Sequence, residues 1–430
     1  SSRNFGIDTG FYPLGSCTMK HNPRLNEKLA RLPGFADIHP LQPTSTVQGA
    51  LELMAQTAQW LGELTGMAAV ALSPAAGAHG ELCGLMAIRA ALEARGNARS
   101  VVLVPESAHG TNPASAHMCG YDIESIPANN RGRVDLAALK NRLAGDVAAL
   151  MITNPNTCGL FEDEIVEMSR LIHEAGGLVY CDGANFNAIV GRVRPGDLGI
   201  DSMHLNLHKT FSTPHGGGGP GSGPVVLSES LAPFAPLPYL KRDGEDWQLV
   251  EHEGEDGAHP FGRMKGFHGQ FAVFVRALAY MMSMGGDGLA QVSADAVLNA
   301  NYLLARLSDV LSPSYDGPCM HETLFDDRFL AGSEITTLDF AKAMIDEGVH
   351  PMTMYFPLVV HGALLIEPTE TEGKESLDLF VDLMRGLAEK AKSENAAEFK
   401  EAPRFTPRRR LDETRAARQP VLRWTPPETA

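Results

Sequence analysis

Short apolar runs alternate with helical patterns through the middle third of the chain. Four runs bounded by turn residues predict strands, at residues 100–106, 147–155, 177–185 and 203–208. Between the second and third runs, residues 162–177 carry apolar side chains at helical spacing and end in glycine. This βαβ rhythm predicts an α/β fold with a mainly parallel sheet flanked by helices, and residues 223–228 predict one further strand.

The pattern changes after the last of these strands. Residues 229–265 are rich in proline, glycine and acids and suggest an excursion or lid, and residues 267–285 form a long apolar helix pattern. A mixture of helical and strand-like pieces follows. We therefore expect an N-terminal arm at residues 1–50, a large α/β domain at 51–290 and a smaller α+β domain at 291–430.

Composition and charge exclude some classes of function. The chain has 430 residues, 44% hydrophobic and 20% charged, as in ordinary globular proteins, and its net charge of -16 argues against a nucleic-acid binder. It has no apolar run long enough for a membrane span and no visible secretory signal, so we expect a cytoplasmic protein with reduced thiols, or a mitochondrial one in a eukaryote. The basic tail at 404–418, with six arginines against two acids, is expected to be solvated, or to dock a partner.

Polar residues follow the predicted strands at the sheet edge where ligands of α/β proteins usually bind. Four loops supply them: His109, Thr111, Asn154, Asn156, Asp182, Asn185, His208 and Lys209. Upstream, residues 73–94 form a small-residue turn that leads into a helix. The free backbone N–H groups near Ala76, Gly77 and Ala78 at that helix start suit a phosphate.

An anion pocket, a carboxylate and a lysine at strand ends together suggest pyridoxal 5'-phosphate. The pyridine nitrogen needs a carboxylate such as Asp182, and the aldehyde needs an amine such as Lys209, which lies 27 residues later on the next predicted strand. The flat ring of His109 could cover one face of the cofactor. Each residue also has an ordinary interpretation: Asp182 as a cap, Lys209 as a surface lysine and His109 as a loop hydrogen-bonding group.

A glycine-rich passage, residues 216–223, follows Lys209. The P-loop pattern places its lysine after the glycines, so that interpretation fails. A flexible linker remains possible, but we expect close approach of this backbone to a cofactor or a neighbouring subunit.

Seven motifs in order along the chain closely resemble the glycine cleavage system P-protein, the glycine decarboxylase. They are FYPLGSCTMKHNPRLNE (11–27), AAGAHGE (75–81), ESAHGTNPASA (106–116), NPNTCGLFE (154–162), DGANFNAI (182–189), HLNLHKTFSTPHGGGGPG (204–221) and YFPLVVHGALLIEPTETEGKESLD (355–378). The length resembles the C-terminal half of the long single-chain enzyme, or subunit 2 of the split bacterial form.

The resemblance implies a fold-type I pyridoxal phosphate enzyme of the aspartate aminotransferase-like class. It implies that Lys209 forms the Schiff base, that Asp182 faces the pyridine nitrogen and that His109 stacks on the ring. Further cofactor contacts implied by position are Ala76, Gly77, Ala78, Thr111, Asn156, Ala184 and His208. No metal site is expected.

The implied reaction is decarboxylation of glycine with transfer of the aminomethyl group to the lipoyl arm of H-protein. The implied assembly is a heterotetramer of two copies each of this chain and of P-protein subunit 1. His321, Thr336 and Tyr355 are candidates for binding the glycine carboxylate. Two alternatives remain: a non-catalytic scaffold subunit of the same complex, or another decarboxylase or lyase of the same fold.

Overall fold

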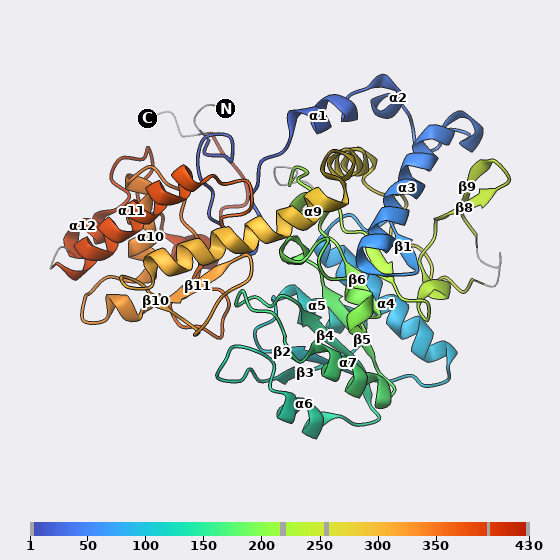
Figure 1. The fold of residues 1–430 in the computed structure, drawn as a ribbon, viewed down its shortest axis with the longest axis horizontal. Coiled ribbons are helices and arrows are strands. Elements are labelled where there is room, and N and C mark those ends of the chain that lie inside the picture. Colours follow the sequence, from blue (N-terminus) through green and yellow to red (C-terminus); the bar gives the residue numbers. More distant parts are fainter. Residues whose placement is uncertain (1–3, 216–220, 253–257, 394–395, 427–430) are drawn as a thin grey trace.

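A seven-stranded sheet organises the larger part of the chain (Figure 1). The computed structural model describes residues 4–215, 221–252, 258–393 and 396–426. The strand order is β1-β7-β6-β5-β4-β2-β3, with β2 to β6 parallel and β7 antiparallel to both of its neighbours. The strands are β1 (Ala69–Ala71), β2 (Val101–Pro105), β3 (Asp122–Ile126), β4 (Val147–Thr153), β5 (Leu178–Asp182), β6 (Ser202–His204) and β7 (Val225–Leu227). The expected mainly parallel sheet is confirmed.

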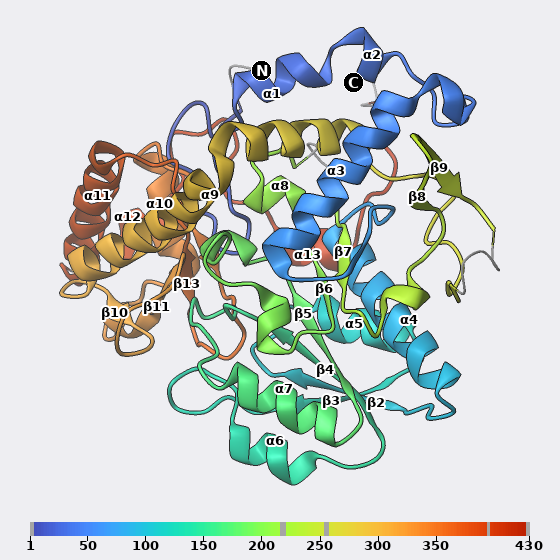
Figure 2. The same ribbon diagram turned by 45° about the vertical axis from the view of Figure 1, so that its right-hand side comes forward.

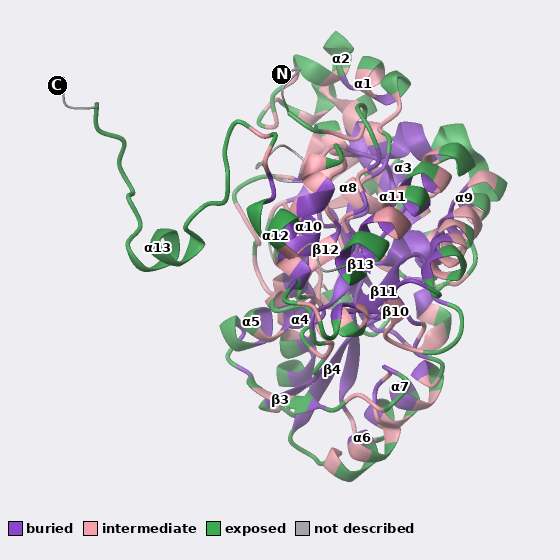
Figure 3. Ribbon diagram, turned by 90° about the vertical axis from the view of Figure 1, so that its left-hand side faces the viewer, coloured by how far each residue is buried: buried purple, intermediate pink, exposed green. Residues whose placement is uncertain are grey.

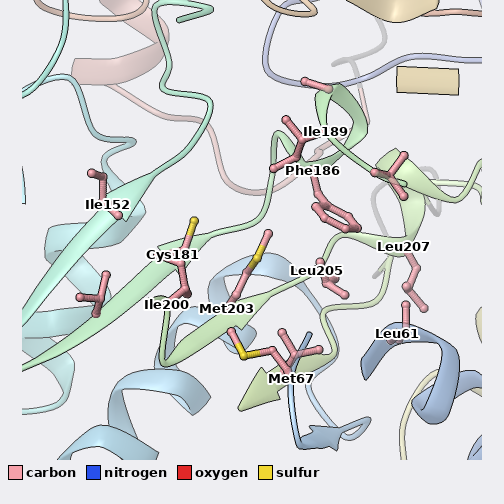
Figure 4. Packing of buried hydrophobic residues seen from close by; sticks show 14 of the residues in the cluster. Leu61, Met67, Ile152, Cys181, Phe186, Ile189, Ile200, Met203, Leu205 and Leu207 are labelled. Carbon is pink, nitrogen blue, oxygen red and sulfur yellow. The ribbon is translucent and has the colours of Figure 1, made fainter. Parts of the chain in front are cut away.

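Both faces of this sheet are covered, which explains why its central strands read as continuous apolar runs. Every residue of β4 is buried. One face packs against α4 (Gly77–Ala94) and α5 (Thr111–Met118), and the other against α3 (Gln48–Thr65), α7 (Ile165–Glu174) and the first half of α9 (Phe271–Leu307). Figure 4 shows the packing on the second of these faces, where Cys181 and Met203 of the sheet meet Phe186 and Leu205.

The strand expected at 203–208 is wrong in its second half. β6 ends at His204, and Lys209 lies on α8 (Leu207–Thr210), a single helical turn rather than a strand end. The backbone carbonyl of Asn206 accepts hydrogen bonds from the N–H groups of both Lys209 and Thr210, which closes this turn. α8 packs beside α9 (Figure 2).

The seven-stranded sheet and its helices form the large layer of the molecule. A second, smaller layer contains a four-stranded antiparallel sheet in the order β10-β11-β13-β12. Its strands are β10 (Ser312–Pro313), β11 (Thr323–Asp326), β12 (Thr353–Met354) and β13 (Leu364–Ile366). A separate apolar core lies between this sheet, α10 (Thr337–Asp346), α11 (Lys374–Lys392) and α12 (Ala396–Glu401).

α9 connects the two layers (Figure 1). The apolar helix expected at 267–285 is joined to a following helical segment across Gly285, whose φ of 64° and ψ of 178° are not helical. The domain limit proposed near residue 290 thus falls inside this kinked helix, and the division into three parts stays a prediction.

The N-terminal segment also touches both layers. Leu14 pairs with Ile366 beside β13, and Lys20 reaches the main body at Asn187 and Thr210. After it come α1 (Arg24–Ala30) and α2 (Pro33–Ala36), which pass over α9 (Figure 2).

Several other sequence-based expectations meet the structure here. The 229–265 excursion holds a hairpin of β8 (Tyr239–Asp243) and β9 (Asp246–Val250). Gly216 to Gly219 lie outside the described residues. In the part that is described, no helix is long and apolar enough to cross a membrane, and all six cysteines are free thiols.

The basic tail leaves the body of the molecule after two anchoring contacts (Figure 3). Arg404 pairs with Asp346, and Arg410 pairs with Asp339 on α10. Beyond them, α13 (Glu413–Arg418) and its flanking residues are exposed through residue 426. This agrees with the expectation of a solvated tail.

Candidate functional site

A cavity of about 190 Å³ opens at the carboxyl ends of β4, β5 and β6, against the starts of α4 and α5. Predicted site residues that line it are Gly77, Ala78, His109, Thr111, Asp182, Ala184, Asn185, His208 and Lys209. These residues come from four separate segments of the chain and meet because parallel strands end at a common edge. The convergence expected from the sequence is thus present for most of them.

Asp182 ends β5 and is almost completely buried. Its Oδ1 accepts a 2.9 Å hydrogen bond from the Ala184 N–H, and its Oδ2 accepts a 3.0 Å bond from the Asn112 amide. Burial alone would raise the pKa of Asp182, but nearby His204 and these two donors lower the pKa below its ordinary value. The cavity therefore contains a buried carboxylate that stays ionised.

Lys209 reaches the same cavity from α8 and is half-buried. Its Nζ donates a 2.7 Å hydrogen bond to the backbone carbonyl of Ser16, far away in the sequence. The adjacent His208 accepts a bond from the Ser222 N–H, and burial, with His215 and Lys209 nearby, lowers the pKa of His208 to about 3. His208 is thus a neutral ring beside a basic amine.

The start of α4 supplies backbone donors to the cavity. The N–H groups in the first turn of any helix lack an intrahelical acceptor. Ala76 precedes the helix in an extended conformation and provides no side-chain cap for them. A Cβ at residue 77 would lie 2.6 Å from Asn206 Nδ2, so any larger residue there would displace the Asn206 amide. Gly77 and Ala78 line the cavity, and Ala76 does not.

His109 and Thr111 form one hydrogen-bonded unit at the start of α5. His109 Nδ1 lies 2.8 Å from Thr111 Oγ1, and Thr111 Oγ1 donates to Glu81 of α4 at 2.7 Å. The His109 ring also meets Phe356 edge to face, with 5.6 Å between centroids. The histidine ring is thereby held at the cavity wall from two sides.

Asn154 and Asn156 do not reach the cavity. Asn156 donates its amide hydrogens to the Gly132 carbonyl and to Glu162, and its Oδ1 accepts from the N–H groups of Cys158 and Leu160. Asn154 Oδ1 accepts from the Glu162 N–H. The Asn156 amide is thus fully used in holding the loop after β4, whereas Asn154 Nδ2 is buried without a hydrogen bond among the described residues.

The three carboxylate-binding candidates are dispersed. His321 is fully buried, Thr336 caps α10 through Asp339, and Tyr355 is 46% exposed with its hydroxyl accepting a hydrogen bond from the Leu338 N–H. Within the described part of the chain, none of them lines the cavity.

Sequence reasoning missed several residues that shape the site. Ser16, Glu81, Thr153, Thr157, His204 and Asn206 line the cavity. His204 follows the same strand-end logic as Asp182, since it ends β6, and Tyr180 and Asn206 hold its ring nitrogens at 2.6 and 3.1 Å. Ser16 has no such signal, because it reaches the cavity from the N-terminal segment.

Two family models match the chain. Residues 292–404 match the model described as glycine dehydrogenase, C-terminal domain, and residues 82–220 match aminotransferase class-V. Among curated proteins, the chain is 68% identical to probable glycine dehydrogenase (decarboxylating) subunit 2 of Caulobacter vibrioides, covering 99% of this chain and 82% of the relative. It is 53% identical to the protein of the same name from Listeria monocytogenes, covering 99% and 86%.

Solved structures share the fold. A glycine decarboxylase (P-protein) of the glycine cleavage system, in inhibitor-bound form, matches with a TM-score of 0.75 at 21% identity, over 90% of this chain and 86% of that one. Oryza sativa TDC with PLP and tryptamine matches with a TM-score of 0.68 at 14% identity, over 88% and 84%. The fold class expected from the sequence is confirmed.

Proposed function

This chain belongs to the family of glycine dehydrogenase (decarboxylating) subunit 2, and on that premise we propose that its cavity binds pyridoxal 5'-phosphate and glycine, with Lys209 as the covalent anchor. The observation that carries the proposal is the meeting of an ionised buried carboxylate, an amine and a bare helix start in one cavity. Asp182, Lys209 and Gly77 provide these three features.

The donor set of the cavity fits this cofactor. The first-turn N–H groups of α4 suit its phosphate, and the absence of a Cβ at Gly77 lets this turn pack against Asn206 and His204 at the cavity. Asp182 suits the pyridine nitrogen, because an ionised carboxylate keeps a proton on that nitrogen. When bound, the cofactor supplies a protonated ring that takes up the electron pair left at the substrate's α-carbon as carbon dioxide departs.

The remaining residues around the cavity would orient the cofactor and cover it. His109, fixed by Thr111 and Phe356, would cover one ring face, and Ala184 contributes to the wall beside Asp182. His208 is uncharged at neutral pH, so it leaves Lys209 as the basic group at that end of the cavity. Ala76 supports the phosphate turn from outside the cavity, and Asn156 supports the loop after β4.

The substrates and partners follow from the family. We propose that the chain decarboxylates glycine and transfers the aminomethyl group to the lipoyl arm of H-protein. The name subunit 2 implies a partner subunit, for which we propose subunit 1, in a heterotetramer with two copies of each chain. A cytoplasmic location remains a prediction.

A non-catalytic scaffold subunit is the alternative from another class of function. Such a chain keeps the fold and the partner-binding surface but has no need of a buried ionised carboxylate opposite a lysine. Asp182 and Lys209 both line the cavity here, which favours the catalytic role.

The direct test is cofactor binding by the purified chain. We expect wild-type protein incubated with pyridoxal 5'-phosphate to stay yellow after gel filtration, and the Lys209→Ala variant to lose this absorbance while remaining folded by circular dichroism. Glycine–bicarbonate exchange, with H-protein and with or without subunit 1, then tests the reaction and the partner. A colourless wild-type chain would overturn the proposal.

A further inference from the structure

Residues 16–20, here called the strap, pass between the two layers of the fold beside Lys209. Ser16 and Thr18 have φ angles of 64° and 46°, in the left-handed region that residues other than glycine rarely adopt. The Ser16 carbonyl accepts a hydrogen bond from Lys209 Nζ, and the Cys17 carbonyl lies 2.8 Å from His215 Nε2. Such backbone strain persists only where surrounding groups hold it.

Two buried carboxylates hold the strap from the small layer. Glu322 Oε2 accepts a 2.9 Å hydrogen bond from the Ser16 N–H, and Glu367 Oε2 accepts a 3.0 Å bond from the Thr18 N–H. Thr323 on β11 pairs with Ile366 on β13, so Glu322 and Glu367 lie just beyond this pair on neighbouring antiparallel strands. Both side chains are fully buried.

The remaining polar atoms of this cluster make no hydrogen bond within the described residues, and His321 Nε2 lies 3.8 Å from Glu367 Oε1. Glu322 Oε1, Glu367 Oε1 and both ring nitrogens of His321 are buried without a hydrogen bond in the described structure. One nitrogen or oxygen atom from each of His321, Glu322 and Glu367 lies within 4.8 Å of the other two. The other ionisable groups that face the cluster are Lys209 from α8, Cys17 from the strap and Glu370 after β13, and Glu370 is already paired with Lys20.

Two ionised carboxylates cannot remain so close in a dry interior. Burial, and then Glu367, raise the pKa of Glu322 well above its ordinary value, and burial raises the pKa of Glu367 to about 7. Burial also lowers the pKa of His321 to about 3, so that ring is neutral and does not compensate the carboxylates. At neutral pH the pair therefore retains a proton.

We propose that Glu322 and Glu367 form a proton-sharing pair whose outer oxygens hold the strained strap, and that they are positioning residues for Lys209 through the Ser16 carbonyl. The consequence for Lys209 rests on the role proposed for that lysine above. The carboxyl pair and its hold on the strap do not depend on that role.

The pair gives the fold a defined pH dependence. Folded Glu367 releases its proton near pH 7, compared with an ordinary value of 4.5, so the folded chain binds the extra proton between these values. Its stabilisation is fully present below about pH 4.5 and is lost as the pH rises through about 7. Between about pH 5.5 and 8.5 this term raises the unfolding equilibrium constant about thirtyfold. Because burial lowers the pKa of His321, the stability that this ring contributes falls as the pH drops below about 6.5. The effect of Glu367 is therefore measured as a difference between variants.

The experiment compares the full cofactor-free chain with Glu322→Gln and Glu367→Gln across that pH range, by denaturant unfolding. Asp326→Asn is the control, because it removes a carboxylate of β11 that faces Arg328 rather than a second carboxylate. We expect Glu367→Gln to abolish the alkaline loss and Glu322→Gln to reduce it, because burial still raises the pKa of Glu367 when the second carboxyl is gone, while the control retains the loss. Persistence of the loss in both glutamine variants would overturn the shared proton.

Cys17 reports the strap independently, because it is partly exposed while the other five cysteines are buried. Glu367→Leu removes the acceptor of the Thr18 N–H, so we expect iodoacetamide to modify Cys17 at least tenfold faster, as measured by peptide mass spectrometry. Glu367→Gln keeps an acceptor oxygen and should restore slow modification. Equal rates in all three proteins would exclude a hold on the strap.

Two further measurements separate the possible failures. Binding of pyridoxal 5'-phosphate should be weakened by Glu367→Leu and retained by Glu367→Gln. A wild-type chain that binds no cofactor overturns the role of Lys209. The Cys17 modification and the unfolding results then decide whether Glu322 and Glu367 share a proton and hold the strap. Stoichiometric divalent metal in the purified protein would overturn the proposal, since metal ligation by His321, Glu322 and Glu367 requires both carboxylates to lose their protons.

Discussion

The buried ion pair of Lys20 and Glu370 is expected to be a main attachment of the N-terminal segment. Lys20 Nζ donates to Glu370 Oε1 at 2.6 Å, and to Asn187 Oδ1 and the Thr210 carbonyl at 2.8 Å each. The side chains are 1% and 8% exposed. Burial alone would lower the pKa of Lys20, but Glu370 raises the pKa above its ordinary value, so the pair is ionised.

Lys20→Met retains most of the side-chain volume and removes the charge. Glu370 is then left buried without its partner, and two oxygen acceptors lose a donor. Breaking a buried pair in this way costs about 3–5 kcal/mol. The control is Lys374→Met, whose partner Asp378 lies one helical turn away and whose own side chain is 74% exposed, so that change should cost about 0.5 kcal/mol or less.

The assay is urea unfolding followed by both tryptophan fluorescence and circular dichroism. A double-mutant cycle with Glu370→Leu isolates the pair, and we expect the double variant to be more stable than the sum of the single losses by about 2 kcal/mol or more. If Lys20→Met costs no more than Lys374→Met, or if the two single losses simply add, the reasoning is refuted.

Three further outcomes follow from the structure. Asp182→Asn should keep cofactor binding, seen by absorbance, while glycine–bicarbonate exchange falls at least about a hundredfold, because a neutral amide cannot keep the ring nitrogen protonated. Gly77→Ala places a Cβ 2.6 Å from Asn206 Nδ2, so spectral titration should show cofactor affinity at least about tenfold weaker, with unchanged circular dichroism. Deleting the chain from Leu411 onward should change the Tm by less than about 2 °C in calorimetry, because residues 411–426 are exposed whereas Arg410 retains its contact with Asp339.

The apolar pattern alone determines much of the large sheet. Buried parallel strands need continuous short apolar runs, and β2, β4 and β5 each match such a run in the sequence. Because parallel strands end at one edge, the chain order of Asp182 and Lys209 also predicts that their side chains meet. That logic requires no knowledge of packing.

The ends of strands and the contacts of single side chains were less predictable, because strand pairing and turns decide them. Apolar residues continue at every second position with Leu205 and Leu207, so the pattern cannot show that β6 ends at His204 or that Lys209 lies on a helical turn. The end follows from pairing with β7, which matches only Ser202, Met203 and His204. Asn156 has the residue type of a ligand contact, yet its hydrogen bonds are all used within its own region.

What the sequence by itself determined was the set of elements and the edge of the sheet where the chemistry lies, because these depend on local periodicity and on chain direction. Only the tertiary structure placed the strap beside Lys209, with Glu322 and Glu367 behind it. Those groups come from distant parts of the chain, and no periodicity links them. Their charge states depend on burial, and burial exists only after both layers of the fold have come together.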